Sequence, residues 1–85
     1  MSEKFLLIHF VKTSKRRFEI LKILLKGSAM QKEIQNKMNI HRSNLSVLLS
    51  AMEKKGLIEN KTPGVYRSPI YAITDLGCEI LRKIK

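Results

Sequence analysis

Residues 41–51 carry side chains that can hydrogen-bond to base edges, at helical spacing and without a carboxylate. Arg42 has the forked guanidinium that matches a guanine edge, and Asn44 has an amide that can pair with adenine. Val47 can contact a thymine methyl group. Ser43 and Ser46 suit phosphates or ordered waters, and Ser50 lies on the same face. The chemistry that these residues indicate is recognition of duplex DNA.

A helix must hold these side chains, and its apolar stripe is made of Leu45, Leu48, Leu49 and Met52. From Arg42 to Met52, eleven residues pass without an acid. A solvated helix face usually mixes charge signs, so this face is suited to a polyanion. Gly56 ends the helix in a left-handed conformation. The sequence predicts a DNA recognition helix from about Arg42 to Lys55.

A shorter helix precedes this one. Ser28 and Gln31 have the spacing of a capping box, and Asn39 is a left-handed terminator. Three residues are predicted to face inward: Met30, Ile34 and Met38. Only Ile40 and His41 then separate the two helices, so residues 28–56 are predicted to form a helix-turn-helix. His41 can either contact a phosphate or cap the second helix.

An earlier helix begins with three cations: Lys15, Arg16 and Arg17. Thr13 or Ser14 caps this helix, which runs to Lys26. Cations at an N-terminus oppose the helix dipole, which indicates a phosphate backbone nearby, although a solvated charge cluster is the alternative. One stripe is predicted from Phe18, Leu21, Leu24 and Leu25, and a second surface from Ile20 and Ile23.

Beyond Gly56 the apolar period becomes that of strands. Residues 57–61 and 69–73 are predicted strands, with a turn at 62–64 between them. The resulting hairpin, residues 57–73, has a long tip and forms a wing. Arg67 is placed to enter the minor groove or bind a phosphate, with Tyr66 packing along the sugar. Thr74 caps a final helix, residues 74–85, in which Asp75 occupies the first turn and Leu76, Ile80, Leu81 and Ile84 form the stripe.

The apolar run from Phe5 to Val11 fits either a helix or a short buried strand. We favour a helix, because so small a domain has little interior to cover both faces of the segment. Residues 1–12 then provide a dimerisation segment, together with apolar residues of the last helix. The alternative is that this segment folds back over its own core in a monomer.

The composition of the 85 residues indicates a single domain with a nucleic acid or anionic surface as partner. The formal charge is +10 and the pI is near 10.1. The single cysteine, Cys78, excludes an internal disulfide and suits the cytoplasm. No apolar run reaches the roughly 18 residues of a membrane span. No catalytic set, metal-ligand cluster or phosphate-binding glycine loop is present in the sequence, so neither an enzyme nor a cofactor is predicted.

In its motifs the chain resembles winged helix-turn-helix transcriptional regulators of the MarR and ArsR kind and many small archaeal relatives. The matching stretches are Arg42–Ser46, Met52–Ile58 and Tyr71–Gly77. The resemblance covers about Lys15 to Lys85 and implies a winged helix-turn-helix. With the N-terminal helix included, the predicted fold is mainly α with a small β-hairpin, in the order α-α-α-α-β-β-α. The cysteine and histidine metal-sensing clusters of ArsR proteins are absent, and the long terminal helices of MarR proteins are truncated. A metal response is therefore not expected, and the sequence does not identify a small-molecule effector.

Together these features predict a sequence-specific regulator that binds double-stranded DNA as a homodimer. Its recognition helix lies in the major groove and its wing contacts the backbone or minor groove. The alternative is a winged-helix module that binds protein in the transcription machinery. Such a module would present an apolar patch on the recognition face, and Val47 with Ala51 makes only a small one.

Overall fold

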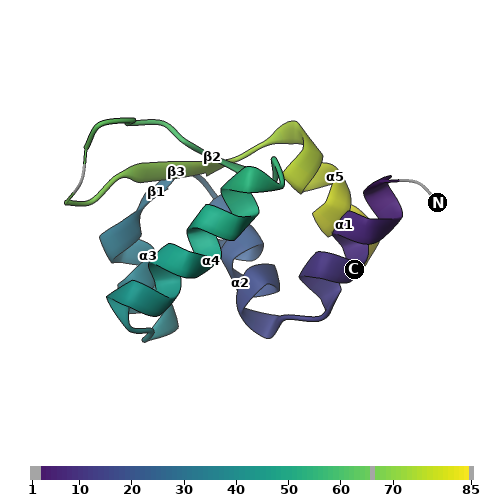
Figure 1. Cartoon of the computed structure of the whole chain (residues 1–85), viewed down its shortest axis with the longest axis horizontal. Coiled ribbons are helices and arrows are strands. Elements are labelled where there is room, and N and C mark those ends of the chain that lie inside the picture. Colours follow the sequence, from purple (N-terminus) through teal and green to yellow (C-terminus); the bar gives the residue numbers. More distant parts are fainter. Residues whose placement is uncertain (1–2, 66, 85) are drawn as a thin grey trace.

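The computed structural model describes residues 3–65 and 67–84, which form five helices and a small antiparallel sheet that lies along one side of the helices (Figure 1). Their bounds are α1 (Glu3–Lys12), α2 (Lys15–Leu25), β1 (Ala29–Met30), α3 (Gln31–Met38), α4 (Arg42–Lys54), β2 (Ile58–Asn60), β3 (Ile70–Ile73) and α5 (Asp75–Ile84). The mainly helical fold with a small hairpin is confirmed. The N-terminal apolar segment is a helix.

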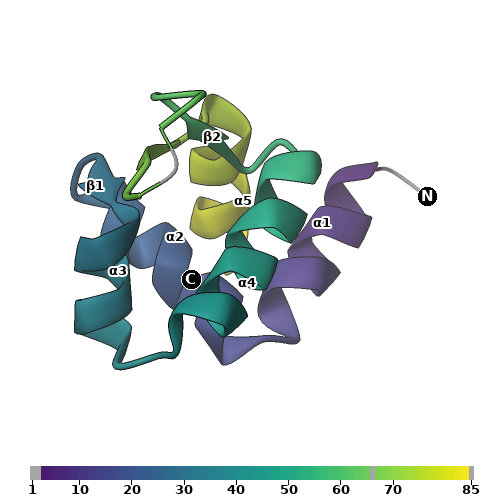
Figure 2. The ribbon, with the colours of Figure 1, turned by 60° about the vertical axis from the view of Figure 1, so that its left-hand side comes forward.

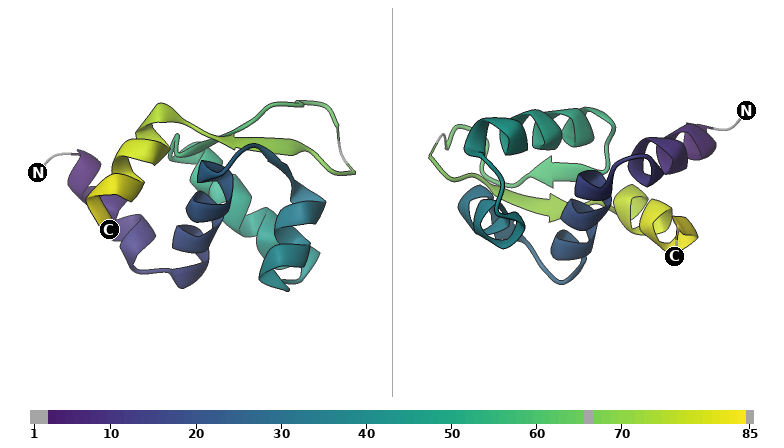
Figure 3. Two further views of the ribbon diagram at one scale, coloured as in Figure 1. Left: turned by 180° about the vertical axis from the view of Figure 1, so that it is seen from behind. Right: turned by 90° about the horizontal axis from the view of Figure 1, so that it is seen from below.

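The molecule is elongated, with extents of 38 × 24 × 21 Å, and its two ends differ. One end holds α1 and α5, which pack against each other although they are the first and last helices of the chain (Figures 1 and 3). The other end holds α3, the start of α4 and the tip of the hairpin (Figure 2). The helix-turn-helix and the wing therefore share one end of the molecule.

The sheet has three strands in the order β1-β3-β2, where the sequence predicted a two-stranded hairpin. Ala29 pairs with Tyr71 and Ile58 pairs with Ile73. The predicted capping box of Ser28 and Gln31 is wrong, because Ala29 and Met30 are extended by pairing with β3. The helix begins two residues later, where Glu33 Oε1 accepts the Met30 N–H at 3.0 Å. The strands are also shorter than predicted.

The ends of the helices follow their local sequences closely. Ser14 caps α2, and its hydroxyl accepts the Arg17 N–H at 3.3 Å. Asn39 ends α3 with a φ of 51°, as predicted. Gly56, with a φ of 77°, ends α4 and donates to the Glu53 carbonyl at 3.0 Å, while Leu57 N–H reaches back to the Met52 carbonyl at 3.1 Å. These bonds satisfy carbonyls that the end of a helix leaves without partners.

The core lies where α2, α4 and α5 meet the sheet, and most of it is aliphatic. Leu45, Leu49 and Met52 on α4 are fully buried, and Leu48 is half-buried, so the predicted stripe of this helix is confirmed. The prediction for α2 was wrong at two positions. Ile20 is fully buried in the core rather than on a second surface, and Leu25 is 45% exposed. In α3, Ile34 is buried but Met30 is 40% exposed, because Met30 belongs to β1.

A close contact joins the end of α4 to the start of α5. The Thr74 hydroxyl donates to the Gly56 carbonyl at 2.6 Å and accepts the Gly77 N–H at 3.0 Å. Any Cβ at Gly77 would lie 2.2 Å from the Leu57 carbonyl oxygen and 2.7 Å from Ile73 Cγ1. Only glycine fits there, which gives a packing reason for the threonine and glycine of the motif that ends at Gly77.

Helix α1 folds over its own chain, packing on α2 and α5. Val11 is fully buried, and Leu7, Ile8 and Phe10 are half-buried against the core. Lys4 Nζ lies 2.5 Å from Glu79 Oε2 of α5 and lowers the pKa of that carboxyl. Much of the terminal apolar surface is thus covered within one chain, as the monomer alternative requires. Within the described residues, no helix is long and apolar enough to cross a membrane.

Candidate nucleic-acid interface

The outer face of α4 consists of small, polar and basic side chains. It is a shallow surface formed by Ser46, Val47, Ser50, Ala51 and Lys54, with exposed Ser43 one turn before Val47. Val47 is 70% exposed, although valine is usually a core residue. The same helix buries Leu45 and Leu49 on the opposite side. The helix therefore presents an acid-free surface, and it lies along one edge of the molecule (Figure 3, right).

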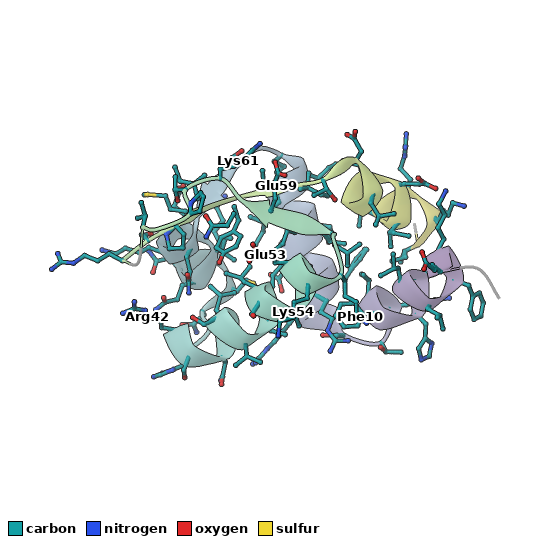
Figure 4. All side chains as sticks on the ribbon, turned by 45° about the horizontal axis from the view of Figure 1, so that its top comes forward. Phe10, Arg42, Glu53, Lys54, Glu59 and Lys61 are labelled. Carbon is teal, nitrogen blue, oxygen red and sulfur yellow. The ribbon has the colours of Figure 1, made fainter. Side chains whose placement is uncertain are left out.

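Glu53, the first acid after the acid-free stretch, points towards the sheet (Figure 4). It lies near Tyr71 of β3, whose hydroxyl has a pKa raised by burial and further by the Glu53 charge. The next residue, Lys54, lies on the outer face of α4 instead. The packing of α4 on the sheet therefore removes the carboxylate from the surface that a polyanion would approach.

The cap of α4 uses His41. Its Nδ1 accepts the Ser43 N–H at 3.3 Å and lies 2.8 Å from the Ser43 hydroxyl. Of the two roles predicted for His41, the structure shows the capping role. Ser43 is consequently held at the start of the helix, with its hydroxyl bonded to the cap.

Arg42 and Arg67, which are 25 positions apart in the sequence, line one open groove of about 480 Å³. The other lining residues come from α3 and the base of the wing: Gln31, Lys32, Gln35, Asn36 and Ser68. We call this the Arg42–Arg67 groove. Three cations and no carboxylate line it, and Figure 4 shows Arg42 projecting from the start of α4 near the hairpin tip. Such a groove suits a phosphate backbone or an acceptor-rich base edge.

Lys32, Gln35 and Asn36 were not predicted as site residues from the sequence. Nothing in the local sequence indicates that these positions of α3 adjoin the wing. The structure shows the connection. Gln31 N–H donates to the Pro69 carbonyl at 2.9 Å, and Lys32 N–H donates to the Ser68 hydroxyl at 3.2 Å. The first turn of α3 is therefore attached to the base of the wing.

Hydrogen bonds across the base of the wing hold its two strands together. Lys61 N–H donates to the Ile70 carbonyl at 2.7 Å, and Ile70 N–H donates to the Thr62 hydroxyl at 3.0 Å. Thr62 N–H in turn donates to Asn60 Oδ1 at 2.8 Å. Arg67 is exposed on this frame, whereas Tyr66, its predicted companion, lies outside the described residues.

The three cations at the start of α2 have different surroundings. Lys15 and Arg16 are exposed. The Arg17 guanidinium stacks on the Phe10 ring, 3.8 Å from its centroid, and donates to the Phe10 carbonyl at 2.7 Å. Arg17 thus attaches α1 to α2, and of the predicted cluster Lys15 and Arg16 are the two exposed members.

Asn44 lies on a different side of α4 from the groove. It is exposed, but it precedes Lys55 by eleven residues, or about three helical turns, so the two share a flank. Lys55 Nζ is 5.6 Å from the centroid of the Phe10 ring, so this flank faces α1. Ser46, two residues after Asn44, lies on the opposite flank, beside the wing.

No group of three or more His, Cys, Asp or Glu side chains in the described part of the chain is placed to hold a metal ion. Cys78 is half-buried and unpaired. The groove and the outer face of α4 offer cations, hydroxyls and amides, which bind partners through charge and hydrogen bonds.

The two-helix motif, the three-stranded sheet and the hairpin define a winged helix-turn-helix domain. The sequence model of the winged helix-turn-helix family matches residues 16–85, and the chain belongs to this family. No curated protein sequence matches the chain.

Several solved structures share this fold. HlyU from Vibrio cholerae N16961 matches with a TM-score of 0.78 at 21% identity, over 95% of this chain and 84% of that one. The transcriptional regulator Tm0710 from Thermotoga maritima matches with a TM-score of 0.77 at 20% identity, over 96% and 59%. The homodimeric winged helix-turn-helix DNA-binding domain Mb0332 from Mycobacterium bovis matches with a TM-score of 0.73 at 22% identity, over 95% and 71%. At these identities the likeness is one of fold.

Proposed function

We propose that this protein is a sequence-specific transcriptional regulator that binds double-stranded DNA. The observation that carries the proposal is the joining of Arg42 and Arg67 in one acid-free groove beside the acid-free outer face of α4. A helix with an exposed face of this kind fits the major groove, and a basic wing fits the adjoining backbone or minor groove. The function is binding, and no reaction is assigned.

Different side chains of α4 would contact the bases and the phosphates. Arg42, exposed in the first turn, would bond to a guanine edge, and Val47 would contact a thymine methyl. Ser43 and Ser50 would meet phosphates or waters. Asn44 would reach a base only at the edge of the contact, because its flank faces α1.

The exposed cations outside α4 would add binding energy without sequence preference. Arg67 on the wing and Lys32 beside it would contact the backbone at one edge of the recognition helix. Lys15 and Arg16 at the start of α2 would contact it elsewhere. Each phosphate neutralised releases counterions, so these contacts should appear as salt dependence of the affinity.

We also propose that the regulator acts as a homodimer through the end of the molecule that holds α1 and α5. Leu6 of α1 is 58% exposed, and the half-buried Ile84 lies on the neighbouring helix α5. The homodimeric state of the M. bovis domain, which has the same fold, supports a two-fold arrangement. Two modules would read two half-sites, which gives enough contacts for a genomic target.

Selection of bound duplexes from a random DNA pool at physiological salt tests the first proposal. We expect enrichment of one motif, repeated as two half-sites about one helical turn apart. A pool that shows no enrichment would contradict sequence-specific binding and would favour the protein-interaction alternative.

Sedimentation equilibrium tests the dimer. We expect twice the 9.8 kDa of one chain, and dissociation in Leu6→Glu. The matched control is Leu25→Glu, at an apolar position of α2 that is 45% exposed. A native protein that stays monomeric at micromolar concentration would contradict the dimer as the resting state.

A further inference from the structure

One buried polar side chain connects the two parts of the candidate interface. Gln31, at the first position of α3, is only 9% exposed. Its Nε2 donates to the hydroxyl of Ser46 on α4 at 2.8 Å. Gln31 lines the Arg42–Arg67 groove, and Ser46 lines the outer face of α4. The hydrogen bond therefore crosses from one surface to the other.

The backbone of Gln31 is fixed as firmly as its side chain. Its N–H donates to the Pro69 carbonyl at the base of the wing, 2.9 Å away. The same residue therefore contacts the wing through its main chain and the recognition helix through its amide. The N–H donor of that amide therefore meets Ser46 while the main chain is held at the wing.

This contact determines whether the Ser46 hydroxyl donates or accepts a hydrogen bond on its exposed side. A serine hydroxyl has one donor and two acceptor sites, and on a helix it often donates to the carbonyl four residues earlier. Among the described residues, Ser46 makes no such bond to the Arg42 carbonyl, and its hydroxyl is bonded to Gln31. Since Gln31 is the donor, the proton of Ser46 remains available on the exposed side.

Resting on the proposed function, we propose that Gln31 is a positioning residue that makes Ser46 a hydrogen-bond donor towards DNA. Ser46 lies one turn after Arg42 on the flank beside the wing. A donor there favours bases that offer an acceptor in the major groove, such as N7 or O6 of guanine or O4 of thymine. It disfavours cytosine, whose major-groove edge offers an amino donor. A serine whose hydroxyl has no such partner can donate or accept, so it would not discriminate between bases that offer an acceptor and bases that offer a donor.

Two substitutions at Gln31 change the hydrogen-bonding role of the Ser46 hydroxyl in different ways. Gln31→Met has a similar length but no hydrogen-bonding group, so the Ser46 hydroxyl can turn freely. Gln31→Glu supplies an acceptor only, so Ser46 would donate inward and present its lone pairs to the DNA. The added charge in Gln31→Glu should weaken binding to every sequence, but the preference among bases at one position is a ratio that is insensitive to a uniform loss.

The experiment is selection from the random duplex pool with the native protein, Gln31→Met, Gln31→Glu and Ser46→Ala. At one base pair, the native protein should prefer an acceptor-bearing base over cytosine by about three- to tenfold, the size of one neutral hydrogen bond. The preference should disappear in Gln31→Met and Ser46→Ala and should move towards cytosine in Gln31→Glu. Ser28→Ala, at an exposed serine outside the candidate interface, is the control and should leave the preference at that base pair unchanged.

A double variant separates positioning from a purely structural role. Gln31→Met combined with Ser46→Ala should show the same preference as either single variant, because both remove one donor. Preferences that add in the double variant would overturn the proposal, as would an identical base profile in the native protein and both Gln31 variants. If Gln31→Met does not fold, the ordering of native protein, Gln31→Glu and Ser46→Ala still decides the question. A native protein that enriches no sequence would remove the proposed function and this inference with it.

Discussion

The first turns of α2 and α4 both carry cations and no acid, but the two sets of charges have different surroundings. In α2, Arg17 stacks on Phe10 of α1 and donates to the Phe10 carbonyl. In α4, Arg42 is exposed and shares a groove with Arg67. A cation at a helix start can therefore serve the fold in one case and a partner in the other. The residue that packs against it decides which.

The two ends of the molecule differ in the same way. The end with α1 and α5 is held by close packing and by bonds within the chain, such as those of Thr74 and Arg17. The end with α3, α4 and the wing carries exposed side chains with hydrogen-bonding capacity. Substitutions at the first end should change stability, and substitutions at the second should change binding.

The largest effect is expected from Gly77→Ala. Its new Cβ would meet the Leu57 carbonyl oxygen at 2.2 Å, so α5 must shift relative to the end of α4. We expect the free energy of unfolding to fall by about 3 kcal/mol, at the upper end of overpacking effects. Urea denaturation measures it, and Lys83→Ala, at an exposed position of the same helix, should stay within about 0.5 kcal/mol of the native protein. Equal stability of the two variants would show that this contact relaxes freely.

Arg17→Ala should come next, with a loss of about 2–3 kcal/mol of unfolding free energy. The variant removes a hydrogen bond from a charged donor and a cation–π contact. Buried Arg17 Nε has no partner among the described residues, which limits the loss. Arg16→Ala is the matched neighbour and should leave the unfolding midpoint unchanged. If Arg17→Ala is as stable as Arg16→Ala but binds DNA poorly, Arg17 belongs to the interface and the distinction between the two helix starts is wrong.

The residues in these two predictions illustrate which features of the fold could be predicted from the sequence and which could not. The Leu45, Leu49 and Met52 stripe and the terminators Asn39 and Gly56 were predictable, because each depends on neighbours within one or two turns. Strand β1 was missed because its partners, Tyr71 and Ile70, lie about forty residues away. Arg17 and Arg42 could not be distinguished for the same reason. Only the packing of α1 on α2 shows that the Arg17 guanidinium is bound to Phe10.

The candidate site was predictable to a similar extent. The recognition helix and Arg67 were both proposed from local patterns, whereas their meeting in one groove depends on the attachment of α3 to Pro69 and Ser68. Gln31 was missed as a functional residue, because a glutamine at a helix start is ordinarily a capping residue. Its role follows from a contact across fifteen residues.

Arg42→Ala should leave the unfolding midpoint within error of the native protein, since Arg42 is exposed. It should lower discrimination between the selected duplex and a shuffled one by about 1–3 kcal/mol. Fluorescence anisotropy titrations on both duplexes measure the difference. An equal loss on the two duplexes would instead assign Arg42 to a phosphate.

The smallest effect is expected from Lys15→Ala with Arg16→Ala. The pair should weaken binding to the selected and shuffled duplexes equally, and removal of each phosphate contact should reduce the slope of log affinity against log salt by about 0.9. Titrations at several salt concentrations provide the slope. The control is Lys22→Ala with Lys26→Ala, at two exposed lysines, one in α2 and one directly after it. An unchanged slope would identify Lys15 and Arg16 as solvated charges.

The central claim is that α4 reads the major groove through Arg42. The most direct test replaces single guanines of the selected duplex with 7-deazaguanine, which lacks the N7 acceptor, and measures the affinity of the native protein and Arg42→Ala. We expect one guanine at which the native protein loses about tenfold in affinity and Arg42→Ala loses nothing further, consistent with one bidentate contact. The claim is contradicted if the native protein tolerates every replacement, or if Arg42→Ala remains as sensitive as the native protein at each guanine.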